Sequence, residues 1–334
     1  MKAYLLFALK RFIQLLAVIF FGCTAAFFIS HLSPISPIDM IIGRVSGQSS
    51  YSPEAIISLR ATLEELFGLN VPLHEQYFHF LQRLAVGDFG PALIAFPRPA
   101  MELVMLALPW TVGLLTVTTI FHWIVGNILG GLAGYYQNSR LLKAFGVVAI
   151  SVQPIPYYVV AFLMVIVFGF LWPVLPISDG FAMNVRPGWS FEFVGSVLHH
   201  AILPAAALTV VGLGTWFLGM RALVSNIVTE DYVTYAELAG VKQNRIVFSY
   251  VIRNAVVPQL TGLALSLGGI FSGTVITEQV FSYPGLGSLL VRAVNGGDST
   301  LVLAISCIAI VAVGGAIFLI DLIHPLLDPR VKVE

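Results

Sequence analysis

Long apolar stretches separated by short polar ones make up most of this chain. Runs without Asp, Glu, Lys or Arg extend between residues 11 and 39, 102 and 140, 143 and 179, 192 and 221, 253 and 278, and 298 and 321. Each run exceeds the roughly 20 residues that a helix needs to cross about 30 Å of hydrocarbon. Because backbone groups in lipid must bond within their own segment, each run is interpreted as a transmembrane helix. The pattern predicts an all-α membrane protein with six spans. The second and third runs are long enough to hold re-entrant ends, so a seventh span stays open.

The first run predicts a retained anchor and not a cleaved signal peptide. Its apolar stretch, residues 12–30, is longer than the core of a signal peptide, and no small-x-small cleavage pattern follows it. The chain then divides into this anchor span over 1–31, an extracytoplasmic helical loop over 32–102, and a core with five spans over 103–334.

Lys and Arg residues gather on one side of the predicted spans. With six spans, that side holds both termini, whereas the short loops opposite contain only Arg186 and Arg292. Positive charge favours the cytoplasmic side. Both termini and the polar segment 229–245 are therefore expected in the cytoplasm.

The 32–102 loop is expected to hold two helices. The first begins at Ser52-Pro53-Glu54 and stops at Gly68, and the second runs from about residue 74 to 85 and stops at Gly87. Side chains expected to face inwards in the second helix are Tyr77, Phe78, Leu81 and Leu84. This loop is expected to be a cap or docking surface or, equally well, a loop that only packs the helix ends.

The composition of the chain excludes several classes of function. The chain is 58% hydrophobic and 10% charged with zero net charge, and no basic stripe indicates nucleic-acid binding. Cys23 and Cys307 both fall within predicted spans, so we expect small apolar packing residues and not a disulfide or metal pair. Spans without central ionisable residues argue against an ion-coupled carrier. For His122 and Asn127, in the second run, we expect satisfied interhelical hydrogen bonds.

Catalytic motifs are missing from the sequence. It contains no G-x-x-x-x-G-K-[ST] phosphate loop, no H-E-x-x-H zinc pattern and no G-x-S-x-G elbow. His199 and His200 are adjacent and would point apart on a helix, so they make a poor chelating pair. We expect a non-catalytic chain that binds no metal or cofactor and takes its energy from a partner.

Small residues recur at helical spacing in two spans. Gly126, Gly130 and Gly134 form a doubled GxxxG pattern in the second run. The fifth run contains Gly262, Gly268, Gly269 and Gly273. Such patterns allow close helix approach in lipid. Helix packing is the expectation, with pore lining as the alternative.

The segment TEDYVTYAELAGVKQNR, residues 229–245, is unusually polar for this chain. If it is one helix, its acids lie near the positive end of the dipole and its bases near the negative end. Ala236, Ala239 and Gly240 would then form one small face suited to a groove on another protein. A solvated connector is the equally weighted alternative.

Several segments resemble one transporter family. DYVTYAELAGVKQNRIVFSYVIRNAVVP resembles the EAA loop of ABC-importer permeases, in the form found in dipeptide and oligopeptide permeases. Further segments that resemble this family, in the same order along the chain, are FGLNVPLHEQYFHFLQRLAVGDFG, HAILP, ITEQVFSYPGLGSLLVRAVNGGDSTLV and IDLIHPLLDPRVK. The chain departs from the general I-x-L-P ending of the EAA pattern, with Tyr250 to Arg253 in that place and Pro258 later. Glu237 stands where many relatives have Arg or Lys.

The resemblance implies a type I ABC importer permease in a bacterial inner membrane. Its implied partners are a homologous second permease, two cytoplasmic ATPase subunits, an extracytoplasmic solute-binding protein and membrane lipid. ATP and Mg would bind to the ATPase subunits. Peptides are the expected solute, while oligosaccharides, nickel chelates and, in another class, a stand-alone carrier or channel stay open.

The resemblance also assigns residue roles within the loop 229–258 and at the outer mouth. Residues implied in ATPase coupling are Asp231, Tyr232, Tyr235, Ala236, Glu237, Ala239, Gly240, Lys242 and Arg245. Outer-mouth candidates are Glu278, Phe281, Pro284, Gly285 and Asp298.

Overall fold

The computed structural model describes residues 2–31, 38–39, 42–43, 52–66, 70–272 and 275–327. These residues form helices and no β-strand. Among them, the helical stretches long and apolar enough to cross a membrane are α1 (Lys2–His31), α5 (Ala100–Tyr135), α8 (Phe191–Ile227), Gln243–Gly268 and α14 (Ser299–Leu327). The fourth stretch joins α10 (Gln243–Arg245), the π-helical turn η3 (Ile246–Ile252) and α11 (Arg253–Gly268). The protein is therefore an all-helical, multi-pass membrane protein.

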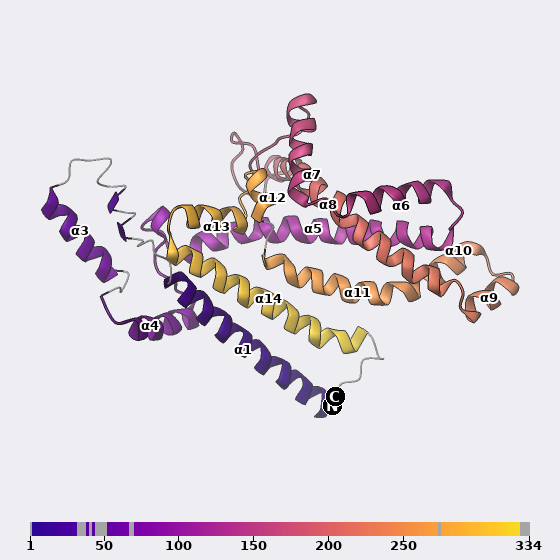
Figure 1. Ribbon diagram of the computed structural model, residues 1–334, viewed down its shortest axis with the longest axis horizontal. Coiled ribbons are helices and arrows are strands. Elements are labelled where there is room, and N and C mark those ends of the chain that lie inside the picture. The colour runs from indigo at the N-terminus through magenta and orange to yellow at the C-terminus, as the bar shows by residue number, and fades with distance from the viewer. Residues whose placement is uncertain are drawn as a thin grey trace.

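The third apolar run is not a straight span. It forms α6 (Arg140–Val152), then α7 (Tyr157–Val165) with a π-helical end η2 (Ile166–Leu171), and the two parts meet at 104°. Pro154 and Pro156 lie in the break, where their missing N–H groups interrupt the helix. Figure 1 shows α7 standing across the direction of α6. The predicted six spans are reached only if this bent pair counts as one.

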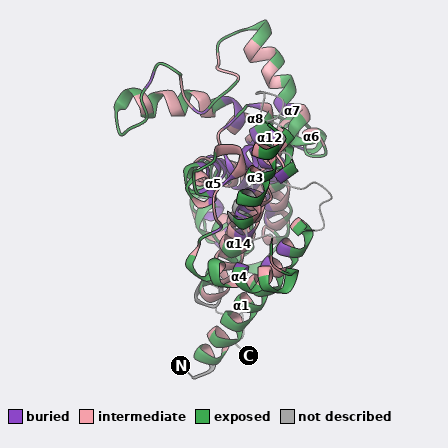
Figure 2. Ribbon diagram, turned by 90° about the vertical axis from the view of Figure 1, so that its left-hand side faces the viewer, coloured by how far each residue is buried: buried purple, intermediate pink, exposed green. Residues whose placement is uncertain are grey.

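Helices α5 and α8 form the centre of the fold and cross in close contact along their length (Figure 1). Buried residues gather around these two helices, whereas α1 is largely exposed or intermediate (Figure 2). An exposed apolar helix surface is what lipid contact requires. The inside of the bundle is thus the α5–α8 side, and α1 lies at its edge.

Helices α1 and α14 run side by side (Figure 1). The hydroxyl of Tyr4 donates a 2.9 Å hydrogen bond to the carbonyl of Leu322, which brings the start of α1 to the end of α14. Cys23 and Cys307 are both free and fully buried in the apolar cluster between these helices. The expectation that they are packing residues is confirmed.

The segment between α1 and α5 contains α3 (Pro53–Leu66), α4 (Leu73–Val86) and the short turn η1 (Leu93–Ala95). Helix α4 packs on the last turns of α1 through stacked rings of Phe27 and Phe80, and Thr24 shares a 2.8 Å hydrogen bond with Tyr77. Gly87 ends α4 in the left-handed conformation, as predicted. The expected inward position of Phe78 is wrong, because its side chain is 62% exposed and Phe80 takes the buried place.

Between α11 and α14 the chain forms η4 (Gly269–Ser272), α12 (Val275–Val280) and α13 (Leu286–Asn295). Helix α13 packs against α5 near the start of that helix. Helix α9 (Asp231–Leu238) lies at the other end of the molecule with α10, beyond the end of α8 (Figure 1).

Candidate functional site

The polar segment after α8 does not form the single helix expected over 229–245. Helix α9 ends at Leu238, and Gly240 takes a φ of +73°. The N–H of Gly240 donates to the carbonyl of Glu237 at 3.0 Å, and that of Val241 donates to Ala236 at 3.1 Å. This bond pair is a Schellman motif, in which glycine at the left-handed position closes a helix. Gly240 is therefore a helix stop, and the space around its Cβ position is open.

The prediction that Ala236, Ala239 and Gly240 form one small face is consequently wrong. Ala236 is buried with Val233 in an apolar cluster that includes Met220 and Val224 of α8. Ala239 and Gly240 lie outside the helix and are exposed. Apolar burial of Val233 and Ala236 holds α9 against the end of α8, so these residues serve this chain's own core.

The outward surface of α9 carries different side chains. Tyr235 is 70% exposed and Leu238 is 79% exposed. The other coupling candidates that are exposed are Asp231, Tyr232, Glu237, Ala239, Gly240, Lys242 and Arg245. Two large apolar side chains are thus exposed among charged residues at this short helix. We call Tyr235, Leu238, Ala239 and Gly240 the α9 surface.

Hydrogen bonds fix α9 from two sides. The hydroxyl of Tyr135, the last residue of α5, donates to Oε1 of Glu237 at 3.1 Å. On the other side, Nδ2 of Asn254 in α11 donates to the hydroxyl of Tyr232 at 3.2 Å and to the carbonyl of Tyr250 at 2.6 Å. Tyr135 and Asn254 were missed from the sequence, because a side-chain bond between residues far apart leaves no periodic signal. Through these bonds a displacement of α9 would reach α5 and α11.

The GxxxG glycines of α5 face α8. A Cβ at Gly126 would lie 2.7 Å from Cβ of Trp216, and one at Gly134 would lie 2.7 Å from Cβ of Val224. At Gly130 it would lie 2.3 Å from the carbonyl oxygen of Phe217. No side chain fits at such separations, so these glycines allow the backbones to touch. The packing interpretation is confirmed for this face.

The glycines singled out in the fifth run behave differently. Gly268 is in ordinary contact with side chains of α14, and the space at Gly269 is open. Gly273 lies outside the described residues. A close helix contact is thus absent at Gly268 and Gly269, whereas a Cβ at Gly262 would lie 3.1 Å from the ring of Trp216 in α8.

Two polar atoms of α5 contradict the expectation of satisfied interhelical bonds. Nδ1 of His122 and Oδ1 of Asn127 are buried without a hydrogen-bond partner among the described residues. Nδ2 of Asn127 donates to the carbonyl of Trp123 within the same helix. These two atoms therefore make no interhelical hydrogen bond within the described part of the chain.

Glu278 is fully buried between α5 and α13. Its carboxylate accepts hydrogen bonds from Oγ1 of Thr111 at 2.8 Å, from the N–H of Gly287 at 2.7 Å and from that of Ser288 at 3.1 Å. Acceptance from the first N–H groups of a helix is a capping arrangement. Burial raises the pKa of Glu278, and these three hydrogen bonds lower it. In this structure Glu278 holds α12, α13 and α5 together.

The remaining outer-mouth candidates are also largely enclosed. Phe281 and Gly285 are buried, and a Cβ at Gly285 would lie 2.3 Å from Oε2 of Glu278. Pro284 is half-buried beside Gly180. Contact of these side chains with a solute stays a prediction.

Asp298 joins the 93–95 turn to α14. Its Oδ1 accepts from the N–H of Leu301 at 2.9 Å, which caps α14, and its Oδ2 accepts from the N–H of Ile94 at 3.0 Å. The side chain is fully buried. Burial raises the pKa of this carboxyl, and the backbone N–H groups lower it. Asp298 is therefore a structural tie between segments distant in sequence.

No group of three or more His, Cys, Asp or Glu side chains suited to a metal ion occurs within the described ranges. The described part of the chain thus offers contact surfaces and packed helices.

The chain is similar to known transport proteins over nearly all its length. A family model described as "Binding-protein-dependent transport system inner membrane component" matches residues 126–333. An oligopeptide transport system permease protein of Haemophilus influenzae is 28% identical over 333 residues, which cover 98% of this chain and 99% of that protein. A dipeptide transport system permease protein of Lactococcus lactis is 24% identical over 327 residues, with 98% and 99% covered. An oligopeptide transport system permease protein of Bacillus subtilis is 28% identical over 269 residues, with 80% and 83% covered.

Proposed function

Because the chain belongs to the family of binding-protein-dependent transport system inner membrane components, we propose that it is the permease subunit of an ATP-driven peptide importer. The observation that carries this proposal is similarity from end to end with oligopeptide and dipeptide permeases. The chain itself provides half of the path across the membrane. Peptide selection and ATP hydrolysis belong to other subunits.

The α9 surface is the place where ATPase subunits dock. Tyr235 and Leu238 offer exposed apolar contact area, and Lys242 and Arg245 provide charge at the edge. Interfaces of this kind depend on a few large central side chains surrounded by weaker contacts. ATP and Mg bind to those subunits, and this chain binds no cofactor.

Movement at α9 is transmitted along two routes. The Tyr135–Glu237 bond leads into α5, and the Asn254–Tyr232 bond leads into α11. Both helices belong to the apolar stretches that cross the membrane. With α9 in the cytoplasm, both termini lie there as well, and the α3–α4 segment faces a solute-binding protein outside. A homologous second permease completes the path.

The experiment is reconstitution of the full complex in proteoliposomes, with uptake of labelled alanine di- to pentapeptides followed with and without ATP. We expect uptake only with ATP, the ATPase subunits and the binding protein. Leu238→Ser is expected to weaken ATPase retention about tenfold, the usual effect of removing a large interface side chain.

Leu171→Ser is the matched control, because Leu171 at the end of η2 is also exposed, at 67%, and its neighbour Phe168 packs in a different apolar cluster from α9. It should retain ATPase binding and uptake. Peptide flux through this chain without ATPase subunits would overturn the proposal in favour of a carrier or channel. Equal ATPase retention by both variants would overturn the docking site.

A further inference from the structure

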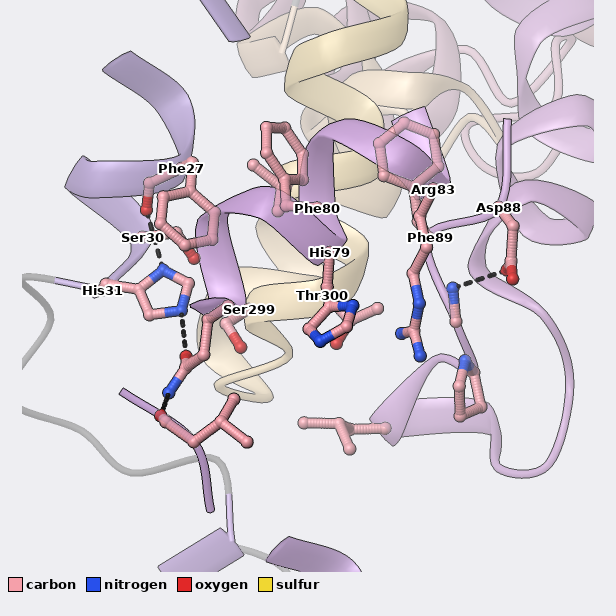
Figure 3. Close-up of a pocket in the computed structure, with 16 residues that line it drawn as sticks. Phe27, Ser30, His31, His79, Phe80, Arg83, Asp88, Phe89, Ser299 and Thr300 are labelled. Carbon is pink, nitrogen blue, oxygen red and sulfur yellow. Dashed lines mark hydrogen bonds between the residues drawn. The ribbon is translucent and has the colours of Figure 1, made fainter. Parts of the chain in front are cut away.

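A cavity of about 270 Å³ lies where α4 meets the end of α1 and the start of α14 (Figure 3). This volume is near the lower end of the roughly 300–1,000 Å³ typical of small-molecule sites. None of the coupling or outer-mouth candidates lines it. The proposed transport function therefore leaves this cavity unexplained.

One wall of the cavity is apolar. It is formed by Phe27 of α1, Phe80 of α4, Leu303 of α14, and Phe89, which follows α4. Phe27 and Phe80 are buried with their rings 5.1 Å apart and stacked. This apolar wall suits a hydrocarbon portion of a ligand.

The cavity lining also carries charges that are not paired. Arg83 and His79 lie one turn apart on α4, and their side chains point in the same direction in Figure 3. The Arg83 guanidinium makes no hydrogen bond or ion pair with any residue that the structure describes. The Asp88 carboxylate accepts a 2.9 Å hydrogen bond from the N–H of Gly90 and has no cationic partner within the described part of the chain. A cation and an anion thus line one cavity without neutralising each other.

The length of the first span would bring the cavity to the level of the lipid headgroups. The span Tyr4–His31 has 28 residues, which at 1.5 Å per residue is about 42 Å long. The hydrocarbon core measures about 30 Å, and about 40–45 Å with the headgroup regions. The last turn of α1, with Ser30 and His31, therefore emerges among the headgroups. Ile29 beside it is 69% exposed, as a lipid-facing side chain would be.

We propose that this cavity binds the headgroup of a zwitterionic phospholipid with a primary ammonium, that is, phosphatidylethanolamine. The phosphate binds the guanidinium of Arg83, whose planar donors match phosphate oxygens. The ammonium donates to the carboxylate of Asp88, and the first acyl carbons lie along Phe27 and Leu303. A lipid fits better than a soluble acidic segment, because the cavity joins opposite charges to an apolar wall beside two spans.

The test uses native mass spectrometry of the full-length protein, delipidated in detergent and titrated with phospholipids of equal acyl chains. Phosphatidylethanolamine should bind more tightly than phosphatidylglycerol, which lacks the ammonium, and phosphatidylcholine, whose quaternary nitrogen has no N–H. Arg83→Gln should weaken binding of all three lipids, and that of phosphatidylethanolamine by about tenfold, as expected for loss of a charge-assisted bond. Asp88→Asn should weaken only phosphatidylethanolamine.

Arg98→Gln is the matched control, because Arg98 is an exposed arginine of the same segment that does not line the cavity. Both cavity variants change exposed side chains, and unchanged thermal unfolding confirms their fold. Equal affinity for the three lipids, or equal binding by Arg83→Gln and Arg98→Gln, would overturn the proposal. Binding of glycerophosphoethanolamine as tight as that of the lipid would overturn the role of the apolar wall. Weakened association with the solute-binding protein, without an effect on lipid, would assign the cavity to protein docking.

Discussion

The hydroxyl of Tyr135 donates a 3.1 Å hydrogen bond to Oε1 of Glu237, although the two residues lie 102 positions apart. Tyr135 ends the central helix α5, and Glu237 belongs to the last turn of α9. The bond therefore links the proposed docking helix directly to a membrane-spanning helix. It gives Glu237 a role within this chain and not only toward a partner.

Tyr135→Phe removes only the donor of this bond. If the proposed coupling through α9 is correct, we expect peptide uptake per ATP hydrolysed to fall about two- to tenfold, since a hydrogen bond contributes about 0.5–1.5 kcal/mol net. ATP hydrolysis should persist. Simultaneous measurement of uptake and phosphate release in proteoliposomes checks this.

Tyr136→Phe is the control, because the Tyr136 ring packs edge-to-face on Tyr135 without a described side-chain hydrogen bond. Glu237→Gln keeps an acceptor oxygen and should preserve coupling. An unchanged uptake-to-hydrolysis ratio in Tyr135→Phe would show that the bond is not part of the transmission.

Gly240→Ala should loosen the end of α9. A left-handed conformation costs a non-glycine residue roughly 1–2 kcal/mol, and Gly240 has a φ of +73°. We expect faster hydrogen exchange of the N–H groups of Gly240 and Val241, measured by mass spectrometry. Gly240→Asn should be milder, because asparagine tolerates this conformation. Gly315→Ala is the control, because Gly315 lies in open space within α14, and it should leave hydrogen exchange in the 231–245 segment unchanged. If the N–H groups of residues 240 and 241 exchange no faster in Gly240→Ala than in the wild type, the helix-stop assignment is contradicted.

Gly130→Ala should destabilise the protein by about 1–3 kcal/mol, the usual effect of overpacking. The added methyl would lie 2.3 Å from the Phe217 carbonyl oxygen, so α5 and α8 must separate. Thermal unfolding of the purified protein in detergent measures this. Gly113→Ala on the same helix meets no atom within 4 Å and should unfold like the wild type. Similar unfolding temperatures for both variants would show that α5 and α8 are not packed as described.

Asp298 accepts one backbone hydrogen bond with each carboxylate oxygen, from Ile94 and from Leu301. In Asp298→Asn an NH₂ group replaces one of these oxygens and cannot accept, so one of the two bonds should be lost. The expected loss near neutral pH is about 1–3 kcal/mol. Burial raises the pKa of Asp298 in the folded protein. The protonated carboxyl therefore stabilises the folded state fully below the ordinary aspartate pKa, and this stabilisation is lost as pH rises through the raised pKa. The stability difference between wild type and Asp298→Asn should therefore shrink with rising pH. Unfolding temperatures from pH 4 to 8 check this, and a growing difference would reverse the assigned direction of the shift.

Local features were predicted where one residue type or one period decides the outcome. Gly87 stops α4 because glycine alone takes the left-handed position readily. The spacing of Gly126, Gly130 and Gly134 indicated a close helix contact, and α8 provides it. Pro154 and Pro156 lie in the break between α6 and α7, but proline chemistry alone does not give the 104° angle found there.

Other local expectations failed because burial depends on the neighbours of a helix. In α4 the pattern predicted that Phe78 faces inwards, but the ring of Phe27 packs on Phe80 instead. In α9 the alanines suggested a surface for a partner, but the end of α8 covered Ala236.

The sequence by itself determined the membrane-spanning apolar runs and the family to which the chain belongs, because hydrocarbon requires long uncharged helices and family motifs are contiguous. The tertiary structure alone decided which side chains meet across long separations. Examples are Tyr135 with Glu237, Ile94 with Asp298, and the unpaired charges of Arg83 and Asp88 at one cavity. Such pairs depend on how helices cross in space, and no periodicity along the chain records that geometry.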